Sequence, residues 1–117
     1  MAFRTLLDAG VHAAAGSDFS PGPFAPLMGM QGMVTRTGWD GTSWGVNQRI
    51  SVAEALKVNT LNGAYASHEE SLKGSITVGK LADFVMLADD PHTVKPEKIK
   101  DIQIVKTVVG GATAYQA

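Results

Sequence analysis

Val11-His12-Ala13-Ala14-Ala15-Gly16-Ser17-Asp18 is a short apolar run that ends in a glycine, a hydroxyl and a carboxylate. Small and β-branched residues without polar alternation predict a strand from Val11 to Ala15 that is buried on both faces, as in a parallel sheet. Asp18 then lies just past the carboxyl end of that strand. Loops converge at this edge of an α/β fold, and the chemistry of such proteins is found there. We therefore predict that Asp18 is a functional carboxylate.

A Gly-Ser-Asp sequence has other interpretations. Gly16 permits a sharp turn and Ser17 can hydrogen-bond locally, so Asp18 would simply end the strand. Alternatively, Ser17 would be a nucleophile, which requires a base within hydrogen-bond reach, and no histidine is placed to activate it. The choice depends on the rest of the chain.

The composition sets limits on the class of protein. A chain of 117 residues has room for one modest domain. The net charge of −1 and the lack of a basic block give no reason to expect nucleic acid or a membrane surface as a partner. The absence of cysteine excludes disulfides and is compatible with the cytoplasm, where we place the protein. We expect no signal peptide and no membrane-spanning segment.

The first half also predicts helices. Phe3, Leu6 and Leu7 form the apolar stripe of a short helix closed by Gly10. A parallel strand needs neighbours, and no other run in the first half resembles one. We therefore expect the chain to begin in the middle of a fold.

A glycine- and proline-rich connection runs from Phe19 to Ile50, a length typical of functional lids. Pro26 would open a helix within it that ends near Gly38. Large side chains in this connection would either line a substrate pocket or pack the loop down, namely Met28, Met30, Met33, Trp39 and Trp44.

Ser51-Val52-Ala53-Glu54 is a capping box that starts a helix at Val52, which we expect to reach about Thr60. A second short helical turn is predicted over residues 63–66, with Asn62 as its cap.

The last third reads as antiparallel sheet. Strands are predicted over residues 81–88 and 102–109, and Gly110-Gly111 turns the chain into a hairpin partner at residues 112–115. Residues 95–100 are a polar crossing.

Two sets of motifs extend over essentially the whole chain. The first is Leu6-Leu7-Asp8-Ala9-Gly10-Val11, Ala14-Ala15-Gly16-Ser17-Asp18, Ser51-Val52-Ala53-Glu54-Ala55-Leu56, Thr60 and Asn62-Gly63-Ala64. The second, more specific, is Gly74-Ser75-Ile76-x-x-Gly79-Lys80-Leu81-Ala82-Asp83-Phe84-Val85, with Asp90-Pro91 and Val108-Val109-Gly110-Gly111. Together they resemble the C-terminal end of the metal-dependent amidohydrolases, especially the branch acting on substituted amides and formamides.

The resemblance implies an α/β fold, a (β/α)₈ barrel with a small β-sandwich built from both chain ends. Residues 1–67 would be the last barrel helix, the eighth strand, its long loop and the eighth helix, and residues 68–117 the C-terminal part of the sandwich. The isolated chain would be α+β. Asp18 matches the aspartate that contacts the metal and accepts a proton from the metal-bound water. A zinc-bound water has its pKa lowered to about 7, so a nearby carboxylate can take its proton.

The family's other metal ligands have no counterpart here. The only histidines are His12, His68 and His92, and we interpret each as structural. The resemblance thus implies zinc or another divalent metal in a longer protein and none bound by this chain alone. Asp83 is expected to fix the turn that precedes its strand by bonding backbone amides, and Lys80 to lie on the surface.

We therefore predict that the chain is the C-terminal segment of a metal-dependent hydrolase that cleaves non-peptide carbon–nitrogen bonds. The longer protein would act on a small amide-type substrate, and this chain alone would be inactive. Phe19, Trp39 and Trp44 are candidates for contacting that substrate. The alternative is a non-catalytic binding module whose uncovered apolar surface drives homo-oligomer formation.

Overall fold

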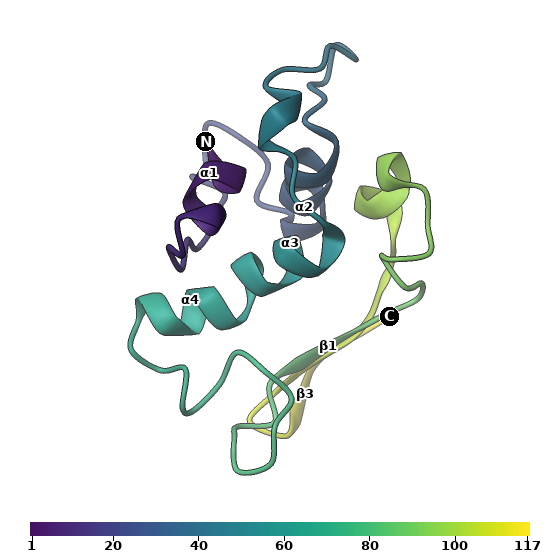
Figure 1. Ribbon diagram of the computed structural model, residues 1–117. Helices are drawn as coiled ribbons and strands as arrows, with labels where there is room; N and C mark the ends of the chain where they lie inside the picture. The colour runs from purple at the N-terminus through teal and green to yellow at the C-terminus, as the bar shows by residue number, and fades with distance from the viewer.

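The computed structural model describes all residues from Met1 to Ala117 and confirms an α+β chain, with helices first and a sheet last (Figure 1). In chain order the elements are α1 (Phe3–Asp8), α2 (Pro26–Thr35), the 3₁₀ helix η1 (Val46–Gln48), α3 (Val52–Asn59), α4 (Leu61–Ala66), β1 (Phe84–Leu87), the 3₁₀ helix η2 (Pro96–Asp101), β2 (Ile104–Val109) and β3 (Ala112–Gln116).

The predicted helix boundaries are mostly confirmed, because their end signals are local. Gly10 adopts φ +76° after α1, the left-handed conformation that closes a helix. Pro26 occupies the first turn of α2, which ends at Arg36 in the left-handed region, before the expected Gly38. At the start of α3, Ser51 Oγ accepts from the Glu54 amide at 3.2 Å, and Glu54 Oε2 accepts from the Ser51 amide at 2.8 Å.

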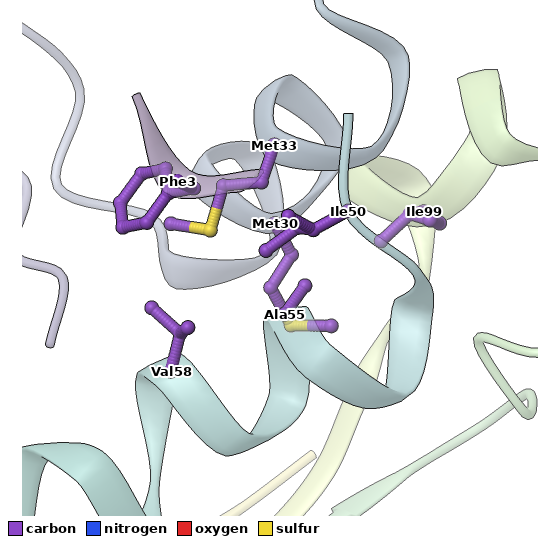
Figure 2. Close-up of a cluster of buried hydrophobic side chains, with 7 residues drawn as sticks. All are labelled: Phe3, Met30, Met33, Ile50, Ala55, Val58 and Ile99. Carbon is purple, nitrogen blue, oxygen red and sulfur yellow. The ribbon is translucent and has the colours of Figure 1, made fainter. Parts of the chain in front are cut away.

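One apolar cluster packs the helices of the first half against η2, the 3₁₀ helix that precedes β2. Its buried members are Phe3, Met30, Met33, Ile50, Ala55, Val58 and Ile99 (Figure 2). Ile99 comes from η2, and the Lys100 amide donates to Gln31 Oε1 of α2 at 3.1 Å. The crossing before β2 therefore folds back onto α2, so the last third of the chain shares the core of the first half.

The sheet is antiparallel with strand order β1-β2-β3. Phe84 pairs with Val108, and Val109 pairs with Ala112 across the predicted Gly110-Gly111 turn. In Figure 1 the long hairpin extends away from the helices, and most of its side chains are exposed. Both outer strands are therefore free edges of the sheet within this chain.

The predicted strand from Val11 to Ala15 is wrong. The segment forms no strand, and Val11 is 46% exposed. Only alternate residues are covered: Ala13 and Ala15 pack against the core cluster. The physical reason is that a parallel strand needs ladder partners, and the three strands that this chain supplies all belong to the distant antiparallel sheet.

None of the helices combines the length and the apolar character needed to cross a bilayer.

Candidate functional site

Asp18 lies at the end of the irregular segment, and its side chain is exposed. Its backbone has φ +51°, an uncommon conformation for a residue with a Cβ, although aspartate tolerates it better than most. Beside it Ser17 Oγ accepts from the Phe19 amide at 3.2 Å. This is the local turn expected of Gly-Ser-Asp, and Ser17 is engaged in it. The turn leaves the Asp18 carboxylate available to other groups.

The segment that carries Asp18 is tied to α4 by Asn62. The Asn62 side chain is 2% exposed, and its Nδ2 donates to the carbonyl oxygen of Ala13 at 2.8 Å. The prediction that Asn62 caps a helical turn is therefore wrong, since it lies inside α4 and makes a contact between distant parts of the chain. The polarity of asparagine alone does not distinguish a helix cap from a buried side chain that hydrogen-bonds to a distant backbone carbonyl.

Four of the five large side chains named in the long connection divide into two groups, and the fifth, Met28, is half-buried. Met30 and Met33 are buried in the core cluster, so they pack the loop down. Trp39 and Trp44 are 85% and 67% exposed. They lie in a short excursion fixed by the Thr37–Ser43 bridge and by Arg36 Nε, which donates to the Trp44 carbonyl at 3.2 Å. Backbone and arginine contacts thus hold the excursion without using either indole.

Phe19 is also exposed and meets Phe24 edge to face, with ring centroids 5.6 Å apart. An exposed aromatic pair next to Asp18 is an apolar surface beside a carboxylate. This is the arrangement that a small ligand with an apolar substituent would contact.

The three histidines do not gather around Asp18 into a ligand set. His12 contacts Tyr65, with ring centroids 4.3 Å apart, and His92 Nδ1 lies 2.8 Å from Asp90 Oδ1. Nowhere do three or more His, Asp or Glu side chains come together as metal ligands would. A catalytic zinc ion uses about three protein ligands, so the residues present do not by themselves fit one.

A shallow pocket of about 250 Å³ lies at His12, near the start of the irregular segment, whereas Asp18 lies at the end of that segment. Its lining residues are Leu7, Gly10, Val11, His12, Glu54, Lys57 and Asn62. A wider groove of about 630 Å³ lies between the start of α2 and the sheet. Asp18 lines neither of them.

The strongest electrostatic feature is an ion pair that the sequence analysis missed. Arg4 donates to both carboxylate oxygens of Glu54, and its Nε lies 3.0 Å from Asp8 Oδ1. The Arg4 bond and the Ser51 amide lower the pKa of Glu54 to about 2. Arg4 is not marked by any local motif, so only the folded chain reveals it.

The glycine-rich motif before β1 is structural. Gly74 approaches α4 so closely that a Cβ there would lie 2.8 Å from Ala64 Cβ. Lys80 is half-buried rather than on the surface, and its Nζ donates to Ser75 Oγ at 2.8 Å. Asp83 Oδ1 accepts from the Gly110 amide at 2.6 Å. It therefore bonds a backbone amide, but in the distant turn between β2 and β3 rather than in the turn that precedes β1, where the bond was predicted.

Comparison with known proteins agrees with these motifs. The model of the amidohydrolase family matches residues 1–115. The chain is 34% identical over 118 residues to the protein named amidohydrolase YtcJ of Bacillus subtilis, covering 98% of this chain and 22% of that protein. It is 33% identical over 113 residues to the N-substituted formamide deformylase of Arthrobacter pascens, covering 97% of this chain and 21% of the deformylase.

Two solved structures share the fold. An amidohydrolase from Thermotoga maritima superposes with a TM-score of 0.72 at 20% identity, over 96% of this chain and 25% of that one. The guanine deaminase of E. coli superposes with a TM-score of 0.70 at 23% identity, over 97% of this chain and 29% of the deaminase. The chain therefore spans between 21% and 29% of the length of these relatives. Because the family model matches residues 1–115 of the 117 in this chain, the chain belongs to the amidohydrolase family.

Proposed function

We propose that this chain is the C-terminal segment of a metal-dependent hydrolase that cleaves non-peptide, amide-type carbon–nitrogen bonds, and that Asp18 is its proton acceptor. The observation that carries the proposal is the placement of Asp18. It is an exposed carboxylate in a strained turn, at the end of a segment clamped to α4. Non-glycine residues held in this sparsely populated backbone region cluster at active sites and ligand-binding loops.

In the longer protein, residues 1–67 would form the last unit of a (β/α)₈ barrel, and residues 68–117 would form part of a small β-sandwich. The uncovered Val11–Ala15 segment would then find its ladder partners in barrel strands supplied by the rest of the protein. This explains why a sequence typical of a buried strand is half exposed here.

The chemistry requires one carboxylate from this chain. A divalent ion such as zinc would polarise a water and make it nucleophilic near neutral pH. Asp18 would contact that ion and take the proton of the attacking water, while the ion's other ligands would come from outside this chain. We propose accordingly that the chain alone neither binds zinc tightly nor hydrolyses amides. The exposed Phe19, Trp39 and Trp44 are the proposed contacts for the substituent on the amide nitrogen.

A segment exchange tests the role of Asp18. This chain would replace the matching part of the Arthrobacter pascens deformylase, and formate release from an N-substituted formamide would be measured. We expect the exchanged enzyme to be active and Asp18→Asn to lower kcat/KM at least about 100-fold, the usual contribution of a positioned acid or base.

Asp89→Asn is the matched control, because Asp89 is another exposed aspartate outside the helices and strands, at a bend after β1. It should leave the rate unchanged. An exchanged enzyme that stays fully active with Asn at position 18 would rule out the proton-acceptor role.

Self-association is a second candidate function, favoured by the free edges of the sheet. Both β1 and β3 lack an outer partner, and Val85, Met86 and Tyr115 are about half exposed. Unpaired edges with apolar side chains readily pair with another copy. Sedimentation velocity of the 117-residue chain tests this: we expect a homo-oligomer, and a strict monomer at high concentration would exclude it.

A further inference from the structure

The segment from His12 to Asp18 has very few hydrogen-bond partners. Two short-range bonds form within its immediate neighbourhood, from the Ala13 amide to the Val11 carbonyl at 2.9 Å and from the Phe19 amide to Ser17 Oγ at 3.2 Å. One bond reaches it from a distant part of the chain, the 2.8 Å bond from Asn62 Nδ2 to the Ala13 carbonyl. The position of the whole segment therefore depends on this amide and on side-chain packing.

The contact of this segment with the core cluster sets its register poorly. Ala13 and Ala15 are the residues that contact the core cluster, and the exposed residue between them is also an alanine. A slip of one residue that brings Ala14 and Gly16 to the core would exchange one alanine methyl for another and the second for a hydrogen, at little cost to this contact. Outside the core cluster, the slip is opposed by the ring contact of His12 with Tyr65. The slip would also move Asp18 along the chain by up to about 3.5 Å and reverse which residues face the core.

Asn62 is well suited to prevent such a slip. Its side chain is almost fully buried, and a buried amide without a partner has lost its hydrogen bonds to water, so the bond to the Ala13 carbonyl is strongly favoured. Its helix is held from outside by Gly74, which lies against Leu61 and Ala64. The donor is therefore at a fixed place on a packed helix.

We propose that Asn62 is a positioning residue for Asp18. Its amide selects the Ala13 carbonyl and thereby sets the register in which the alanine run crosses α4 and the place where Asp18 emerges. The inference rests on the proposed function for its chemical meaning. The hydrogen bond and its effect on the segment are measurable without any activity, so the two proposals can fail separately.

The test is backbone ¹⁵N relaxation of the 117-residue chain carrying Asn62→Asp. At pH 7 the introduced carboxylate would face the Ala13 carbonyl oxygen and repel it. We expect the order parameters of residues 13–18 to fall from about 0.85 to below about 0.6, while those of α3 stay unchanged. A protonated carboxyl can donate to the carbonyl again. Burial raises the pKa of a carboxyl above its usual value of about 4, so order should return when the pH is lowered toward 4 and be lost as it rises.

Two further variants make the result specific. Asn59→Asp is the matched control, because Asn59 Nδ2 donates to the Ala55 carbonyl of its own helix at 2.8 Å, and it should leave residues 13–18 ordered. Asn62→Ala should lose order at every pH. It retains His12, Glu54 and Lys57, the titratable groups beside Asn62 in the pocket, so a pH response confined to the aspartate variant belongs to the introduced carboxyl.

Unchanged order parameters in both Asn62 variants at pH 7 would overturn the inference. So would a loss of order that spreads equally into α3, because Asn62 would then support the fold in general rather than the register of one segment. If the aspartate variant unfolds at pH 7, the alanine variant decides between these outcomes.

Discussion

The guanidinium of Arg4 and the carboxylate of Glu54 form a two-point ion pair between α1 and α3, fifty positions apart in the chain. The same carboxylate accepts from the Ser51 amide, so one side chain both caps α3 and docks α1. Because α1 precedes the segment that carries Asp18, this pair fixes where that segment begins.

Glu54→Gln should reduce the free energy of unfolding by about 1 kcal/mol at pH 7, from typical values for caps and exposed ion pairs. The pKa of Glu54 is lowered to about 2 in the folded chain, below its value near 4.5 in the unfolded chain. Its stabilisation is therefore complete above pH 5 and is lost as the pH falls toward 2. Urea unfolding from pH 7 to pH 3 should show the wild type and the variant converging. Glu97→Gln, a change at an exposed glutamate, should have no such effect.

Ile99→Ala should cost about 2–5 kcal/mol, because Ile99 is fully buried where η2 meets α2. The matched change Ile76→Ala, at a side chain that is 91% exposed, should stay within about 0.5 kcal/mol. Chemical denaturation followed by circular dichroism measures both. Equal effects at the two positions would contradict the shared core.

Gly74→Ala and Gly79→Ala separate backbone strain from steric contact. The two glycines have nearly the same φ, +89° and +92°, but a Cβ at Gly74 would meet Ala64 at 2.8 Å whereas one at Gly79 would meet nothing. Both variants should lose about 1–2 kcal/mol from strain. Gly74→Ala should lose a further 1–3 kcal/mol, roughly the cost of overpacking. Thermal unfolding of the two variants measures the difference between their losses of stability. Equal losses would mean that the chain at Gly74 does not pack closely against α4.

Asp83→Ala should speed hydrogen exchange at the Gly110 amide about tenfold, because it removes the acceptor of a 2.6 Å bond. Asp83→Asn keeps an acceptor oxygen and should change the rate much less. Exchange followed by NMR distinguishes the two. An unaffected Gly110 amide in the alanine variant would show that the backbone bond from Gly111 to Ala82 suffices to hold the turn.

The features predicted from sequence are those encoded by neighbouring residues. The Ser51–Glu54 capping box, the turn at Gly110-Gly111 and the helix opened by Pro26 each act within a few positions. The errors have the opposite origin. Val11 to Ala15 has the composition of a buried strand, but burial depends on partners that this chain does not contain. Asn62 has the chemistry of a cap, but its partner is Ala13, far away in sequence. Arg4 was missed for the same reason.

The most direct test of the central claim is the position of Asp18 relative to a metal ion. Crystals of the segment-exchanged deformylase, grown with zinc and examined by anomalous diffraction at the zinc edge, would locate the ion. We predict a carboxylate oxygen of Asp18 at the ion, about 2.0–2.2 Å away. An ion whose ligands all come from the host enzyme, with Asp18 out of reach of both the ion and its water, would contradict the account.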